Sequence, residues 1–271
     1  MDARQQKALL KETFDTVAEG YDGGALRFFP ASAARMAALL GLRGDENVLD
    51  VACGTGNASL AVARLLPRGR VTAVDFSPRM LERAQRKAAA LGVGNLEFLE
   101  RDMQELGFPD ESFDAATSAF GLFFVEDMAS QLAHIAATVR PGGTVLISNF
   151  QESYFHPLKD LMGERLARCG VPMPPPTWKQ IASEAGCRAL FEQAGLRDIR
   201  TRAENLGYFL ESAEQWWEII WNAGYRRLVS RLAPEEQARF KREHLEEIAA
   251  TGTPEGIWLD VGVLFTAGTK R

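Results

Sequence analysis

The sequence contains few of the residues that build disulfide frameworks or metal sites. Its 271 residues include only three cysteines and three histidines, all far apart along the chain. Neither a CxxC pair nor histidines at metal-ligand spacing occur, which argues against a disulfide scaffold and a zinc site. We therefore expect no bound metal, and we expect Cys53 to be a small packing residue rather than a nucleophile.

Long apolar runs are also missing. No stretch approaches the ~18 uninterrupted apolar residues that favour a transmembrane helix, and the charged opening MDARQQKALLKE lacks the apolar core of a signal peptide. The net charge of -5 provides no general basic face for nucleic acid. These features predict a cytoplasmic protein without a membrane span or a nucleic-acid partner, and they leave its oligomeric state open.

What the sequence does contain, between residues 46 and 150, is an alternation of strand and helix patterns. Strands are predicted at 47–52, 70–75, 96–100, 113–120 and 144–150. Helices are predicted at 57–66, from Pro78 to a stop at Gly92, and at 127–139. Strands separated by helices of this length predict an α/β fold with a doubly wound, mostly parallel sheet covered on both faces.

The remainder of the chain is less regular. The proline-rich stretch 171–176 predicts a connection, and further elements are predicted as a helix at 182–196 and strands at 197–203 and 258–270. These two strands would complete a seven-stranded sheet. We expect residues 204–256 to form a mainly helical insertion, or lid, between them; a separate C-terminal domain is the alternative.

The stretch VLDVACGTGNASL at 48–60 places Asp50 inside an apolar run and follows it with a glycine turn. A buried carboxylate is costly unless it is satisfied. Gly54 permits a positive φ, and Gly56 is expected to leave room for a ligand against the backbone. The N–H groups of the next helix favour a carboxylate, and Asp50 favours a cation. The pattern therefore indicates a ligand with both groups, or else a plain tight turn with a hydrogen-bonded aspartate.

Two more acidic residues follow the next two strands. Asp75 ends its strand 19 residues after Gly56, an offset at which an acidic side chain accepts hydrogen bonds from ribose hydroxyls. Asp102, in RDMQEL, is placed to accept from an adenine amino group. Helix capping is the alternative for both, although Ser77 is the better-placed cap after Asp75. Since ligands of such sheets bind outside the carboxyl ends of the strands, we expect the acidic residues to share one site.

The segments VLDVACGTG, AVDFSPRML, ERDMQELGFPDESFD and VRPGGTVLIS resemble class I S-adenosylmethionine-dependent methyltransferases, over roughly 40–150, with a weaker resemblance at 194–199. The resemblance implies a Rossmann-like sheet, S-adenosyl-L-methionine as cofactor and S-adenosyl-L-homocysteine as product. It implies that the turn from Asp50 to Gly56 holds the methionine part and that Asp75 binds ribose. Ala52 stands where the family often has glycine and is expected to be tolerated in strand-like geometry. The residues implied on the adenine side are Phe76, Met80, Asp102 and Met103.

The N-terminal segment KETFDTVAEGYD, at 11–22, resembles the opening of ubiquinone/menaquinone-type methyltransferases. That resemblance implies that Tyr21, with Phe14 as a second candidate, closes over the cofactor. Alternatively, Phe14, Val17 and Tyr21 form one apolar stripe that packs on the core. We expect residues 1–40 to form an N-terminal helical cap and residues 41–150 to form the cofactor-binding core of a single methyltransferase domain.

The segment SAFGLFF, at 118–124, carries no polar group suited to an exocyclic amine, unlike the Asn/Asp-Pro-Pro-aromatic stretch of nucleic-acid amino methyltransferases. Phe120, assigned to the cofactor site, and its neighbours indicate an apolar cleft wall. Trp217, Trp221 and Tyr225 fall on one helical face and form either the roof of an acceptor pocket or a packing surface. These features favour methyl transfer to the carbon or oxygen of a small apolar or aromatic molecule.

No catalytic triad is evident, because the cofactor supplies the electrophile and the protein need only position the acceptor. His156 is the best-placed base by position, although a surface or structural role is favoured. Two other functions remain open. A nicotinamide-dependent oxidoreductase is disfavoured because GTGNAS lacks the third glycine of GxGxxG and Asp50 would repel a pyrophosphate. A non-catalytic S-adenosylmethionine-binding regulator or scaffold would retain the same acidic residues.

Overall fold

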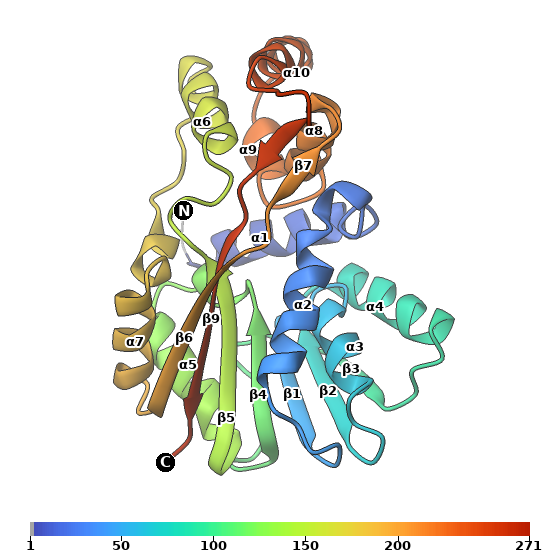
Figure 1. Cartoon of the computed structure of the whole chain (residues 1–271), viewed down its shortest axis with the longest axis vertical. Coiled ribbons are helices and arrows are strands. Elements are labelled where there is room, and N and C mark those ends of the chain that lie inside the picture. The colour runs from blue at the N-terminus through green and yellow to red at the C-terminus, as the bar shows by residue number, and fades with distance from the viewer. Residues whose placement is uncertain (1–2) are drawn as a thin grey trace.

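The computed structural model describes residues 3–271, whose strands build one seven-stranded sheet and a small two-stranded sheet (Figure 1). The order of the large sheet is β3-β2-β1-β4-β5-β9-β6. Its strands are β1 (Asn47–Val51), β2 (Arg70–Asp75), β3 (Leu96–Glu100), β4 (Phe113–Ala119), β5 (Val139–Phe150), β6 (Arg197–Asn205) and β9 (Gly262–Thr269). Only β9 runs antiparallel to its neighbours, β5 and β6. The predicted mostly parallel, Rossmann-like sheet is confirmed.

Helices cover both faces of this sheet because the central strand places apolar residues on both sides. Val48 belongs to the hydrophobic cluster on one face, and Leu49 belongs to the cluster on the other. The first face carries α2 (Phe28–Leu39), α3 (Asn57–Ala63) and α4 (Pro78–Ala90). The second face carries α5 (Met128–Ala137) and α7 (Glu184–Gln193). The site described below therefore rests on the buried central strands of the sheet, whereas the edge strands β3 and β6 are partly exposed.

The helix that follows β2 shows how local sequence sets these elements. Ser77 is the N-cap of α4, and its hydroxyl accepts a hydrogen bond from the backbone N–H of Met80 at 3.1 Å. Pro78 occupies the first turn, where its missing N–H costs nothing. After the helix, Gly92 adopts a φ of 66°, a left-handed conformation that glycine accepts without strain. The start and stop signals in the sequence thus predicted the bounds of α4 closely.

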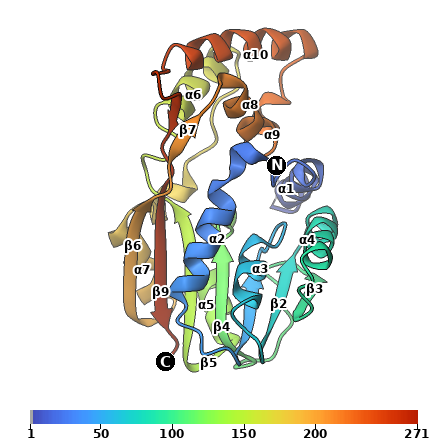
Figure 2. The same ribbon diagram turned by 45° about the vertical axis from the view of Figure 1, so that its right-hand side comes forward.

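A second group of elements lies beyond the carboxyl ends of the parallel strands (Figures 1 and 2). We call this group the cap; it comprises α6 (Leu158–Arg168) and residues 206–261, which connect β6 to β9. Residues 206–261 contain β7 (Tyr208–Leu210), α8 (Ala213–Trp221), α9 (Arg226–Val229), α10 (Pro234–Ala249) and β8 (Ile257–Leu259). Arg165 of α6 forms ion pairs with Glu243 and Glu247 of α10, which join the two parts of the cap.

The N-terminal helix α1 (Ala3–Val17) lies between the cap and the carboxyl ends of the strands (Figure 2). Short 3-10 turns complete the chain at Gly24–Leu26, Leu122–Phe124 and Thr177–Ile181. No helix within residues 3–271 is long and apolar enough to cross a lipid bilayer. The arrangement places α1, the cap and the strand ends around one region of the molecule.

The predicted helical stripe of Trp217, Trp221 and Tyr225 is wrong. Helix α8 ends at Trp221, and Tyr225 follows a break in the helix and precedes α9. The rings of Trp217 and Trp221 stack at 5.7 Å, and the ring of Trp217 also contacts Phe240 of α10. The ring of Trp216 lies 5.7 Å from that of Phe155, in the loop after β5, and its indole N–H donates to His244 of α10 at 2.9 Å. A helical period continues only while the helix does, so the break redirects Tyr225.

Replacing Trp217 with alanine tests what this aromatic residue does. Its side chain is only 9% exposed and packs within the cap. We expect the free energy of unfolding to fall by about 3–5 kcal/mol, as for other buried tryptophans, while affinity for S-adenosylhomocysteine stays within about twofold, since the mutation leaves the strand ends intact. Urea unfolding and calorimetric titration measure the two effects. A large loss of affinity in a well-folded variant would contradict this packing role.

Candidate cofactor and acceptor site

Asp50 lies at the carboxyl end of the central strand and is almost fully buried. Its two carboxylate oxygens accept hydrogen bonds from Ser59 of α3, at 2.5 Å, and from Thr117 of β4, at 2.9 Å. Burial raises the pKa of Asp50 to about 6, although the two hydroxyls and their hydrogen bonds oppose this rise. The carboxylate is thus held rigidly in a place where a cationic partner would favour its ionised form.

The turn after β1 contains three residues in the left-handed region. Gly54 and Gly56 have φ values of 54° and 77°, and Ala52 has a φ of 56°. The expected strand-like geometry of Ala52 is therefore wrong, and alanine in this region costs roughly 1–2 kcal/mol. A Cβ at Gly54 would meet no atom within 4 Å, so the backbone is uncovered there. These conformations explain why the turn is rich in glycine.

Gly56 lies where the glycine turn packs against α4 and β3. A Cβ at this position would lie 3.0 Å from the Cβ of Ala84 in α4 and 3.3 Å from the ring of Phe98. The close approach of α4 and β3 therefore occupies the space on the side where a Cβ would point. Gly56 thus supports the site through packing and through its positive φ.

Asp75 ends β2 beside the glycine turn and is also buried. One carboxylate oxygen accepts from the backbone N–H of Gly54 at 2.8 Å, and the other accepts from Ser77 at 2.9 Å. Burial raises its pKa to about 6 against these hydrogen bonds. A carboxylate has about four acceptor positions, and the backbone groups of Gly54, Ser77 and Phe76 do not use all of them. Because Ser77 caps the next helix, Asp75 is not needed as its cap.

Asp102 follows β3 but already has a partner. One of its oxygens forms an ion pair with Lys7 of α1, and the other accepts from the backbone N–H of Gln104 at 2.9 Å. Met103 packs in the cluster on the α5 face, and its carbonyl oxygen accepts from Gln131 at 2.7 Å. Both residues stand at the predicted strand end, yet α1 covers Asp102 in a way that the sequence did not indicate.

Several of the remaining predicted residues meet α1. Met80 is buried with Val17, Phe14 and Tyr21 in one cluster, and the Phe14 ring lies 6.3 Å from that of Phe76. Burial and then the neighbouring carboxylates of Asp75 and Asp22 raise the pKa of Tyr21. The structure therefore brings Tyr21, which follows the end of α1, next to Asp75, while Val17 is buried and Phe14 and Tyr21 are partly buried. Both readings of this segment describe part of its geometry.

Asp22, next to Tyr21, ties the N-terminal segment to the glycine turn. It accepts hydrogen bonds from Thr55 at 2.8 Å and from Lys87 at 2.9 Å. Burial works to raise the pKa of Asp22, but Lys87 and the hydrogen bonds from Thr55 and Asn57 hold it below its ordinary value. This role of Asp22 was not predicted from the sequence. Its only local signal was the adjacent Tyr-Asp pair in the N-terminal motif.

Phe120 begins a series of aromatic rings that leads from the turn towards the cap. Gly121 beside it approaches the turn closely, since a Cβ there would lie 2.7 Å from the Cβ of Ala52. The ring of Phe120 stacks on Phe150 at 4.4 Å, and Phe150 stacks on Tyr154 at 4.5 Å. An apolar wall was expected at 118–124. Phe150, the last residue of β5, and Tyr154, in the loop after it, extend this wall and were not predicted.

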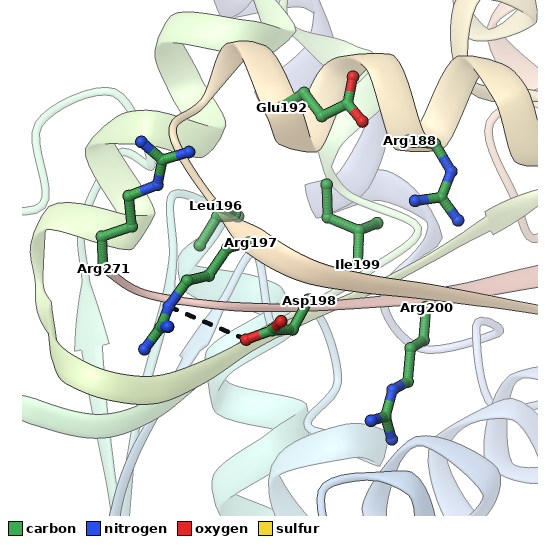
Figure 3. A pocket seen from close by; sticks show the side chains of 8 residues that line it. All are labelled: Arg188, Glu192, Leu196, Arg197, Asp198, Ile199, Arg200 and Arg271. Carbon is green, nitrogen blue, oxygen red and sulfur yellow. Dashed lines mark ion pairs between the residues drawn. The ribbon is translucent and has the colours of Figure 1, made fainter.

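Two open cavities on the described surface lie outside this region. One, of about 440 Å³, is bordered by arginines of α7, β6 and the chain end, including Arg188, Arg200 and Arg271 (Figure 3). The other, of about 450 Å³, lies between α1 and the start of α4 and includes Lys11 and Asp15. Neither contains Asp50 or the aromatic series, so the geometry of the strand ends, rather than cavity size, defines the candidate site.

His156 is not part of this arrangement. Its side chain is 65% exposed, and its Nδ1 atom pairs with Asp160 of α6 at 2.5 Å. The structural reading of this histidine therefore describes its position better than a role as base.

The residues present fit an amino acid–nucleoside ligand. Asp50 and Asp75 are buried side by side closely enough that Asp75 contributes to the raised pKa of Asp50. Gly54 leaves the backbone open, and Asp75 has acceptor positions to spare. A seven-stranded sheet of this order with acidic residues at the carboxyl ends of β1 and β2 is the arrangement of class I S-adenosylmethionine-dependent methyltransferases.

Comparisons with known proteins agree with this assignment to the methyltransferases. Residues 48–143 match the family described as "Methyltransferase domain". The chain is 32% identical over 183 residues to "Ubiquinone/menaquinone biosynthesis C-methyltransferase UbiE" of Marinomonas sp., covering 64% of this chain and 70% of that protein. It is 38% identical over 120 residues to the protein of the same name from Psychromonas ingrahamii, covering 44% of this chain and 48% of that protein, so this match spans about half of the relative.

A solved structure is also similar. The YcgJ protein of Bacillus subtilis superposes with a TM-score of 0.61 at 22% identity, covering 89% of this chain and 98% of that one, which supports the fold. The chain belongs to the class I S-adenosylmethionine-dependent methyltransferases, in the group related to the ubiquinone/menaquinone biosynthesis enzymes, and its cofactor is S-adenosylmethionine.

Proposed function

We propose that this protein transfers a methyl group from S-adenosylmethionine to a carbon or oxygen atom of a small, ring-bearing acceptor. The observation that carries the proposal is the stacked aromatic series that starts at Phe120, beside the glycine turn. Flat rings already pack face to face there, which suits a planar apolar molecule. The relatives named for ubiquinone and menaquinone biosynthesis support the same class of acceptor.

Named residues would hold the cofactor in this proposal. Asp50 would attract its amine, the uncovered backbone at Gly54 would face its amino-acid part, and Asp75 would accept from its ribose hydroxyls. The adenine side would be lined by Phe76, Met80 and Met103, and Tyr21 would close the site. Asp102 would bind the adenine only after its ion pair with Lys7 is broken.

When bound, S-adenosylmethionine supplies a methyl group on a positively charged sulfur. The chain has to hold the acceptor in line with that methyl group and exclude water, and positioning of this kind is worth roughly 7–11 kcal/mol at best. Helix α1 covers one side of the strand ends, and the cap covers another (Figure 2). Aromatic side chains from the end of β5 and from the segments that follow β4 and β5 supply the apolar surroundings.

Thermal denaturation with candidate cofactors tests the proposal. We expect S-adenosylmethionine and S-adenosylhomocysteine, each at about 100 times its dissociation constant, to stabilise the protein by roughly 2.7 kcal/mol and raise its melting temperature. NAD at the same concentration should leave the melting temperature unchanged. Stabilisation by NAD alone would overturn the assignment of the site.

A further inference from the structure

Two tyrosine hydroxyls meet where the sheet domain contacts the cap. Tyr225, in the loop between α8 and α9, donates its hydroxyl hydrogen to the oxygen of Tyr154, in the loop after β5, at 2.9 Å. A phenol oxygen that accepts one hydrogen bond still carries a hydrogen of its own. Within residues 3–271, the structure gives this hydrogen of Tyr154 no acceptor. Tyr154 is therefore a buried donor with a fixed orientation and an unused hydrogen.

The position of Tyr154 connects this donor with the proposed methyl-transfer site. Its ring is the last of the stacked series, two ring spacings from Phe120. Phe120 in turn precedes Gly121, which packs against the turn at Ala52. An acceptor ring inserted into this stacked series would thus have an aromatic ring on each side. The Tyr154 hydroxyl would be the polar group at the far end of the series.

A positive charge lies beside the same phenol. The ammonium group of Lys159, in α6, lies 3.8 Å from the centre of the Tyr154 ring and 4.9 Å from that of Trp178. Burial lowers the pKa of Lys159, with Lys179 acting in the same direction and Asp160, Glu152 and Asp260 opposing. A half-buried cation at this end of the series favours an electron-rich oxygen on a bound molecule over an apolar substituent.

We propose that Tyr154, oriented by Tyr225 of the cap, donates a hydrogen bond to an oxygen atom on the methyl acceptor. The inference rests on the proposed function, because it concerns the acceptor part of the same site. Tyr154 is then the specificity-determining residue, and it selects rings that carry a hydroxyl or carbonyl over rings of the same shape without one. Tyr225 is a positioning residue, since it acts only by fixing the Tyr154 hydroxyl.

Binding of two matched ring compounds to the protein loaded with S-adenosylhomocysteine tests this selection. The probes are 2-naphthol and 2-methylnaphthalene, which have similar shapes and differ in one oxygen. Because a buried donor without a partner is costly, we expect 2-naphthol to bind about tenfold or more tightly in calorimetric titrations. Tyr154→Phe should bring this ratio close to one, and Tyr225→Phe should give an intermediate ratio.

Tyr208→Phe is the matched control. The Tyr208 hydroxyl donates to the carbonyl oxygen of Ala25 at 2.5 Å, away from the stacked series, so its removal should leave the naphthol preference unchanged. Circular dichroism of each variant establishes that the fold is kept, and Tyr225→Phe provides a second route if Tyr154→Phe unfolds.

The possible results separate this inference from the proposed function. Equal affinity for the two probes in the unmodified protein, no binding of either probe, or a preference that survives in Tyr154→Phe overturns the role of Tyr154. If S-adenosylhomocysteine still stabilises the protein in those cases, the cofactor assignment stands and only this inference fails. If S-adenosylhomocysteine does not stabilise it, yet Tyr154 still confers the preference in protein without it, the proposed function is what fails.

Discussion

Replacing Asp75 with alanine is expected to weaken binding of S-adenosylhomocysteine at least about 100-fold. Each hydrogen bond to a charged group contributes roughly 1.5–3 kcal/mol, and the proposed interaction uses two ribose hydroxyls. The same substitution also frees the backbone N–H groups of Gly54 and Ser77, so the turn itself loses its anchor. Isothermal titration measures the affinity, and circular dichroism establishes that the sheet persists.

The chain offers a matched control for this prediction in Asp127. Its carboxylate caps α5 by accepting from the backbone N–H of Ser130 at 2.9 Å. Asp127→Ala should cost about 1 kcal/mol of stability, as loss of an N-cap usually does, with no change in cofactor affinity. If Asp75→Ala behaved like Asp127→Ala, Asp75 would be a local structural residue, and the cofactor site would have to lie elsewhere.

The sequence was informative where local patterns decide structure. The strand over 70–75 and the start of α4 at Pro78 agree with the structure because β-prone runs and helix caps act through neighbouring residues. The acidic residues at the carboxyl ends of β1 and β2 were predictable for a similar reason. Parallel strands present their carboxyl ends at one edge, so Asp50 and Asp75 had to come close.

Features that depend on distant contacts could not be predicted. The ion pair of Lys7 with Asp102 joins residues far apart in the chain, and neither has a local pattern that indicates the other. Tyr225 meets Tyr154 from a loop beyond the end of α8, and the aromatic spacing did not reveal this break in the helix. Ala52 takes a left-handed conformation because the turn around it requires one, against the preference of alanine.

Cofactor affinity is expected to fall as the pH is lowered from 7.5 to 5. Burial raises the pKa of both Asp50 and Asp75 to about 6, so both carboxyls take up protons in the free protein below that pH. A bound ammonium group and ribose hydroxyls favour the ionised forms. Each proton that must leave weakens binding about tenfold at pH 5, which gives between roughly 10-fold and 100-fold for the coupled pair.

Protonation of Asp50 and Asp75 changes the free energy of unfolding in the opposite direction, and the titration of His244 masks this change. A carboxyl whose pKa is raised on folding binds more protons in the folded state, so Asp50 and Asp75 contribute stability at low pH that is lost as the pH rises through about 6. His244 acts against them. Burial lowers its pKa to about 4, so its contribution is present above the pKa of about 6.5 in the unfolded chain and is lost as the pH falls through about 4. Melting temperature therefore does not isolate the two aspartates.

Titration of S-adenosylhomocysteine across this pH range isolates them, because His244 is buried in the cap against Trp216 rather than at the strand ends. Asp50→Asn removes one of the two titrating groups, and the remaining pH dependence should correspond to about one proton. His244→Gln serves as the control and should leave the dependence unchanged. An affinity that stays constant from pH 7.5 to 5 would mean that the ligand does not require these carboxylates in their ionised form, and the pairing of Asp50 with the cofactor's amine would have to be abandoned.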